Sequence, residues 1–200
     1  MKEPTIGKLE RVGLREVWQH EALDFTSWLE KNIEILKETL DFSLIDVERE
    51  RPAGSFNIDL VAKDQETDRT VIIENQLEKS DHDHLGKILT YMTAVEAEIA
   101  IWIVADPRPE HVAAVAWLNR STDFSFYMIK VEAVRIGNSL PAPLMTLIVG
   151  PSEDAEAVKH TKDELAERDQ LRKEWWEKII PPQAQIYTNG LRQEQHLGWA

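Results

Sequence analysis

Three polar residues inside two apolar runs are the strongest chemical signal in this sequence. Asp59 lies in the first run, and Glu74 and Gln76 lie in the second, with a polar stretch between the runs. Both runs are rich in β-branched residues, which predicts two strands joined as a hairpin. Side chains two residues apart on a strand point to the same face. We therefore expect Glu74 and Gln76 to share a face while Asn75 points away.

Carboxylates that converge from neighbouring strands could bind a divalent cation. A buried carboxylate is costly unless it has a partner, and paired carboxylate oxygens suit hard cations such as Mg²⁺ or Mn²⁺. A cation held in this way can promote the cleavage of phosphodiester bonds. The pattern thus predicts a metal site centred on Asp59 and Glu74.

The composition is typical of a globular protein of ordinary domain size. The 200 residues include 42% hydrophobic and 30% charged residues and no cysteine, so we expect a core but neither disulfides nor thiolate metal sites. No apolar run approaches the roughly 20 residues of a membrane helix, and no apolar signal region follows Met1. These features predict a cytoplasmic protein with no membrane contact. The formal net charge of −13 disfavours tight binding of bare nucleic acid.

Hydrophobic periodicity predicts an α/β protein with helices packed on a mixed sheet. Helices are expected over 24–40, from Ser80 or Asp81 onward, from Pro109 onward and over 153–180. Strands are expected over 6–12, 44–50, 56–62, 71–76, 99–104, 124–136 and 144–149. Pro52 and Gly54 should end the strand that precedes the hairpin, and Asp24 or Thr26 should cap the first helix.

The hairpin and its flanking helices resemble the PD-(D/E)XK nuclease superfamily. The family pattern places an Asp on one strand and a Glu-any-Lys triplet on the next, which Asp59, Glu74, Asn75 and Gln76 match in order. Two positions depart from it: Gln76 replaces the Lys, and Ile58 replaces the Pro before the Asp. The chain is also similar, over about residues 15–150, to a bacterial group called DUF4268. The stretches that carry this second resemblance are 25–29, 73–79 with 81–87, and 110–111 with 117–119.

The resemblance implies a restriction-endonuclease-like α-β-α core with a mixed central sheet flanked by helices, plus a C-terminal helix. The nuclease-like domain would span 1–150. Residues 151–200 would form a helical extension. Because group members carry a further C-terminal domain, the extension would be either the start of a truncated second domain or the end of a short version of the protein.

The resemblance also implies a catalytic set. Asp59, Glu74 and the backbone carbonyl of Asn75 would bind Mg²⁺ or Mn²⁺, and Gln76 would orient the attacking water in place of the Lys. The missing positive charge would come from Lys87 or His84, on the helix after the hairpin. The third carboxylates that the sequence offers for a second metal are Glu50 and Glu21.

Three functional hypotheses follow. The first is a metal-dependent nuclease in bacterial defence or DNA processing, acting on DNA in preference to RNA. The second is an inactive nucleic-acid- or protein-binding module that retained the fold, which the Lys-to-Gln change and the acidic charge would allow. The third is a homodimer joined through the apolar residues of the 153–180 helix.

Several residues also have a structural interpretation. Gln76 could pair with a neighbouring group instead of contacting the reacting atoms. His82 and His84 invite a zinc assignment, but side chains two apart on a helix diverge, which favours a solvated helix start.

Overall fold

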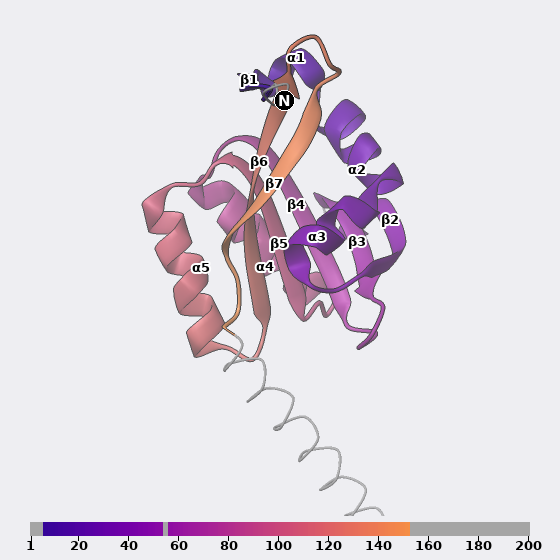
Figure 1. The fold of residues 1–200 in the computed structure, drawn as a ribbon. Helices are drawn as coiled ribbons and strands as arrows, with labels where there is room; N and C mark the ends of the chain where they lie inside the picture. The colour runs from indigo at the N-terminus through magenta and orange to yellow at the C-terminus, as the bar shows by residue number, and fades with distance from the viewer. Residues whose placement is uncertain (1–5, 54–55, 153–200) are drawn as a thin grey trace, which may run out of the picture. The chain divides into compact units, whose positions relative to one another are not determined.

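The computed structural model describes residues 6–53 and 56–152, whose strands form one mixed sheet (Figure 1). The strand order is β1-β6-β5-β4-β3-β2, and β7 also pairs with β6. The seven strands are β1 (Leu9–Val12), β2 (Leu44–Ala53), β3 (Phe56–Asp64), β4 (Thr70–Lys79), β5 (Ile99–Asp106), β6 (Ser125–Ile136) and β7 (Ala142–Val149).

The centre of the sheet combines an antiparallel meander with parallel strands. β2, β3 and β4 pair antiparallel, whereas β4–β5 and β5–β6 pair parallel. Two helices make the parallel crossovers: α4 (His82–Ala94) joins β4 to β5, and α5 (Pro109–Ser121) joins β5 to β6. The α/β class with a mixed central sheet flanked by helices, as predicted, is confirmed.

Helical segments cover both faces of this sheet and create two apolar layers (Figure 1). One layer contains the N-terminal helical residues Phe25, Leu29 and Leu36, packed on Ile73 and other inward residues of the sheet. The other layer contains residues of α4 and α5, among them Ile88, packed on the opposite sheet face. Because β4 is covered on both sides, its residues from Val71 to Leu77 are all buried. Polar side chains in this strand are therefore expected to have specific partners.

The single helix predicted over 24–40 is wrong, because the segment is a chain of short helical turns. It comprises a π-helical turn η1 (Glu21–Thr26), α2 (Ser27–Lys31), a 3₁₀ turn η2 (Ile33–Leu36) and α3 (Lys37–Leu40). The helical path begins before Asp24, whose carboxylate accepts a hydrogen bond from the His20 N–H. It is interrupted at Asn32, whose side-chain amide donates to the Trp28 carbonyl and ends α2 there. A short helix, α1 (Leu14–Val17), precedes this segment.

The expected end of β2 at Pro52 is also wrong, since the strand continues to Ala53 with Pro52 paired to Asn57. β2 lies at the edge of the sheet, where one side of the strand makes no ladder and a missing N–H is tolerated. The strand is irregular: its register shifts between Ile45 and Glu48. Two further residues, Asp46 and Glu50, adopt left-handed φ angles of 51° and 55°.

Most other predicted elements are confirmed within a few residues. Asp81 caps α4 by accepting a hydrogen bond from the His84 N–H, as its position predicts. The predicted extension 151–200 and its charged helix lie outside the described residues, apart from 151 and 152. No helix in the described ranges is long and apolar enough to cross a membrane.

Candidate active site

Asp59 and Glu74 lie opposite each other where two paired strands separate. The antiparallel ladder between β3 and β4 ends at the pair Leu60 and Ile73. Asp59 and Glu74 are the next residues on each strand, and they are near neighbours, because Asp59 contacts the Asn75 N–H and its charge acts on Glu74. Both lie close enough to Lys87 of α4 to interact with it electrostatically. The hairpin thus brings the two predicted carboxylates together beneath this helix.

Two carboxylates take over the hydrogen bonds that the separated strand no longer makes. The backbone N–H of Asn75 donates to Asp59 Oδ2 at 2.8 Å, and the N–H of Leu77 donates to Glu21 Oε2 at 2.5 Å. Amides two residues apart on a strand point to the same edge, so these two donors face the side that β3 has left. The Asp59 side chain is therefore held by the backbone of the strand that carries Glu74.

The carboxyl group of Glu74 is buried in surroundings that disfavour its ionised form. The residue is only 4% exposed, and its Oε2 has no hydrogen-bond partner among the described residues. Burial and, next, repulsion from Asp59 raise the pKa of Glu74 to about 8, although the nearby Lys87 acts in the opposite direction. Lys87 Nζ lies 3.6 Å from Glu74 Oε1. Because the anion is costly here, the site favours the uptake of a positive charge.

Asp59 shows a smaller perturbation of the same kind. Burial raises its pKa to about 6, and the charge of Glu21 adds to this, while the hydrogen bond from the Asn75 N–H lowers it. Two neighbouring acids whose pKa values are both raised are typical of a functional carboxylate pair, although structural ion networks can do the same.

Gln76 shares the face of Glu74, as predicted, and its amide is fully engaged on one side. The residue is 3% exposed, and its Nε2 donates to the Lys79 carbonyl and to Asp81 Oδ2, each at 2.7 Å. Its Oε1 is buried without a hydrogen-bond partner in the described residues. The structural pairing anticipated for Gln76 is present, therefore, but it uses only the nitrogen.

Asn75 points to the opposite face, as the strand period predicts. Its side-chain Nδ2 donates to Thr26 Oγ1 at 2.9 Å, and both residues are buried. This bond ties the N-terminal helical segment to β4, which brings the neighbouring Glu21 to the strand edge.

Glu50 does not join the carboxylates. Its side chain is 53% exposed and pairs with Arg49 at 3.1 Å. Within the described residues no hydrogen bond or ion pair links Glu50 to Asp59 or Glu74. The left-handed backbone of Glu50 in the irregular edge strand explains why sequence position alone misplaced it. Of the two third carboxylates predicted, Glu21 is the one that influences both acids.

The histidines near α4 divide between two separate contacts. His84 Nδ1 lies 2.8 Å from Asp81 Oδ1, whereas His82 Nδ1 lies 3.0 Å from His111 Nε2. The divergence expected for side chains two apart on a helix is confirmed, so they do not converge on a zinc ion. In the described residues, no group of three or more His, Asp or Glu is arranged to hold a metal.

The residues present nonetheless fit a hard divalent cation with few protein ligands. Glu74 Oε2 is a buried acceptor without a partner, and a buried orphan of this kind calls for an ion or a water. Asp59, fixed from the side by the Asn75 N–H, supplies a second carboxylate. Mg²⁺ in particular is bound through one or two carboxylates, with water and phosphate oxygens completing its shell.

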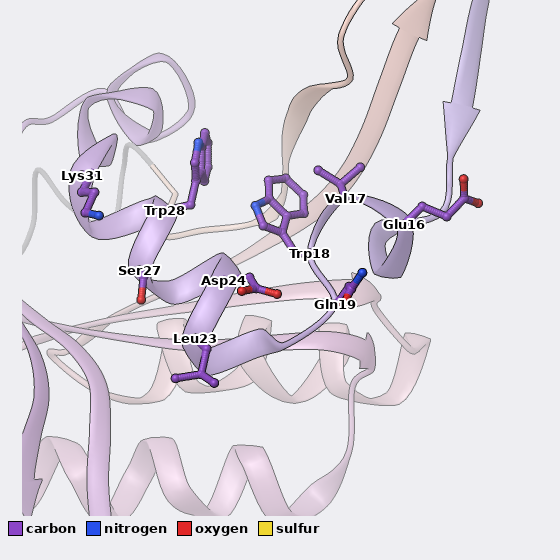
Figure 2. Close-up of a pocket in the computed structure, with 9 residues that line it drawn as sticks. All are labelled: Glu16, Val17, Trp18, Gln19, Leu23, Asp24, Ser27, Trp28 and Lys31. Carbon is purple, nitrogen blue, oxygen red and sulfur yellow. The ribbon is translucent and has the colours of Figure 1, made fainter.

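A cleft of about 610 Å³ is lined by residues of the N-terminal segment (Figure 2). Trp18 and Trp28 line it with ring centroids 5.4 Å apart, and Asp24 and Lys31 add charges of opposite sign. Neither carboxylate of the hairpin contributes to its lining, so the cleft is distinct from the candidate active site.

Comparison with known proteins yields a partial structural likeness. The chain is similar to a solved structure described as a repair endonuclease from Pyrococcus abyssi, with 18% identity and a TM-score of 0.41. The match covers 54% of this chain and 45% of that endonuclease, so it spans less than half of the endonuclease's length. No family model and no curated protein matches the sequence, and the resemblance to the DUF4268 group remains a prediction.

Proposed function

We propose that this protein is a metal-dependent nuclease that hydrolyses phosphodiester bonds at the Asp59–Glu74 site. The observation that carries the proposal is a pair of neighbouring carboxylates, partly buried Asp59 and buried Glu74, in which Glu74 Oε2 has no hydrogen-bond partner among the described residues. Burial raises the pKa of both acids; the charge of Asp59 raises the pKa of Glu74 further, and the charge of Glu21 adds to the increase at Asp59. A structural ion pair would satisfy both oxygens of Glu74, whereas a cation site leaves one free for its ligand.

Each side chain has a specific task in this reaction. Asp59 and Glu74 would hold Mg²⁺ or Mn²⁺, and the Asn75 N–H fixes the Asp59 carboxylate. When bound, the cation lowers the pKa of a coordinated water and offsets the negative charge that builds up on the phosphate. Lys87, 3.6 Å from Glu74 and 40% exposed, can reach outward and contact a phosphate oxygen. It would thereby supply the positive charge that Gln76 lacks.

DNA is the proposed substrate, and its delivery by a partner would fit the acidic chain. A net charge of −13 gives little general attraction to a polyanion. The same charge, together with Gln76 at the position of the Lys, favours the second candidate function, a binding module of this fold without chemistry. A cytoplasmic location and a homodimeric assembly remain predictions, and either would be compatible with both candidate functions.

The test combines metal binding with cleavage on the same samples. Wild-type protein, Asp59→Asn and Glu74→Gln are titrated with Mn²⁺ and Mg²⁺ by calorimetry and incubated with plasmid and single-stranded DNA. Glu78→Gln is the matched control, because Glu78 is on the same strand and its side chain is 73% exposed. A nuclease loses both metal binding and cleavage in the two site variants and keeps both in the control. Metal binding without cleavage would leave the binding-module function, and the absence of both would overturn the proposed metal site.

A further inference from the structure

The orientation of the Gln76 amide is determined by the chemistry of its neighbours. Its Nε2 contacts a peptide carbonyl, that of Lys79, and a carboxylate oxygen of Asp81. A carbonyl and an ionised carboxylate accept hydrogen bonds and cannot donate them. If the amide were reversed, three oxygens would face one another without a proton between them. The NH₂ group must therefore point toward Lys79 and Asp81, and the oxygen must point away from them.

The turn that supplies these two acceptors is held in place from behind. Ser80, between them in sequence, is fully buried and donates its N–H to the Asp106 carbonyl at 3.0 Å. Its hydroxyl lies 2.7 Å from Nδ1 of the buried His111 and accepts the Arg108 N–H at 2.9 Å. Three contacts from the end of β5 and the start of α5 thus fix the turn.

As a result, two buried acceptors on one face of β4 have no donor within residues 6–53 and 56–152. Gln76 Oε1 and Glu74 Oε2 are both without hydrogen-bond partners in the described part of the chain, and both residues are at least nine-tenths buried. When Glu74 is ionised, as metal binding requires, these two oxygens are both acceptors and cannot satisfy each other. A buried amide oxygen costs free energy unless a donor or a cation reaches it.

We infer that Gln76 contributes an oxygen to the divalent-cation site, contacting the cation itself or a water bound to it, and that Asp81 is the positioning residue that sets this orientation. The inference rests on the proposed function and specifies the third oxygen of its site. In this role Gln76 differs from a lysine at the same position: its amide oxygen accepts a hydrogen bond or binds the cation, whereas a lysine ammonium group can only donate hydrogen bonds. The positive charge then comes from Lys87, whose Nζ lies 3.6 Å from Glu74 Oε1, and not from position 76.

The inference can be tested by metal affinity, independently of cleavage. Mn²⁺ binding is measured by calorimetry and by water-proton relaxation for wild type, Gln76→Met and Asp81→Ser. Methionine has a similar length but no amide oxygen. Serine remains an effective N-cap for α4 but is too short to hold Gln76. Asp83→Ser is the control, since it removes one acidic charge from the exposed first turn of the same helix.

Both site variants should bind Mn²⁺ more weakly, by about 10-fold or more, as is usual when a ligand or its orienting partner is removed. The control should stay within about twofold, because an exposed charge is largely screened. A second measurement requires no metal. In ¹H–¹⁵N spectra, the Gln76 side-chain amide protons should exchange slowly with solvent in wild type and rapidly in Asp81→Ser.

The outcomes separate this inference from the function on which it rests. If Glu74→Gln abolishes Mn²⁺ binding while Gln76→Met and Asp81→Ser bind as wild type does, the role of Gln76 is refuted and the nuclease site stands. If wild type itself binds no Mn²⁺, both are refuted. Rapid exchange of the Gln76 amide protons in wild type would refute the proposed orientation whatever the affinities.

Discussion

Replacing Glu74 with glutamine should stabilise the metal-free protein at alkaline pH and remove the pH dependence that this acid contributes. The pKa of Glu74 is raised from 4.5 to about 8 in the folded protein, chiefly by burial. The folded state therefore holds this proton more tightly than the unfolded state does. The stabilisation is complete below pH 4.5 and is lost as the pH rises through 8. Glutamine has nearly the same shape and carries no charge at any pH.

The expected magnitude follows from the two pKa values. One pKa unit corresponds to about 1.4 kcal/mol, so the shift of Glu74 represents on the order of 5 kcal/mol lost between the two pH limits. In the Glu74→Gln variant this loss should disappear. At about pH 8.5 the variant should thus exceed wild type by several kcal/mol, and at about pH 5 the two should be similar.

Urea unfolding in EDTA, followed by tryptophan fluorescence at both pH values, measures the difference. Glu78→Gln serves as the control and should follow wild type within about 0.5 kcal/mol, as exposed substitutions do. Addition of Mg²⁺ at the higher pH should stabilise the wild-type protein and leave the stability of Glu74→Gln unchanged, because only the wild type has the Glu74 carboxylate that binds the cation. A wild-type free energy of unfolding that stays constant or rises from the lower to the higher pH would contradict the assignment of a strained acid at this position.

Three further substitutions have definite expected results. Lys87→Met should reduce the cleavage rate by about 10²-fold, because one charge that stabilises the transition state is lost, and it should raise the pKa of Glu74 further. Single-turnover cleavage over a pH series measures both effects, and an unchanged rate would exclude Lys87 from the reaction. Asn119→Ala should cost about 2–4 kcal/mol of unfolding free energy, because the Asn119 side chain donates to the buried Phe126 carbonyl and accepts from the Phe126 N–H, each at 2.8 Å. Thermal unfolding measures this loss, and a marginal loss would contradict the prediction by showing that water replaces these bonds. Thr26→Val should cost about 1–3 kcal/mol by leaving a buried amide of β4 without its acceptor, and a stability equal to wild type in chemical denaturation would show that this bond is dispensable.

The hairpin could be predicted because its pattern is local. Alternating side-chain direction alone places Glu74 with Gln76 and turns Asn75 away, and the structure agrees with both. Lys87 and His84 were both candidates from the sequence if the helix after β4 lay over the site, and the structure pairs Lys87 with Glu74.

The remaining features depend on contacts distant in sequence. Glu21 reaches the Leu77 amide only because β3 separates from β4, and nothing in the residues near Glu21 indicates that separation. Likewise, Asp81 is recognisable as a helix cap, but its second bond to Gln76 depends on the tight turn that Ser80 and His111 secure. The broken N-terminal helix has a local cause, the side-chain bond of Asn32, that apolar periodicity does not register.

The irregular edge strand β2 bears on how this protein behaves at high concentration. A regular edge strand presents an open row of amides and carbonyls to which a strand of another molecule can add. In β2, the left-handed Glu50, the missing N–H of Pro52 and the register shift that contains the left-handed Asp46 make the strand irregular at three places. A second molecule could therefore form no continuous ladder along this edge. Self-association at β2 is blocked by the backbone itself, so removing the surface charges of this strand should not by itself cause fibrous aggregation.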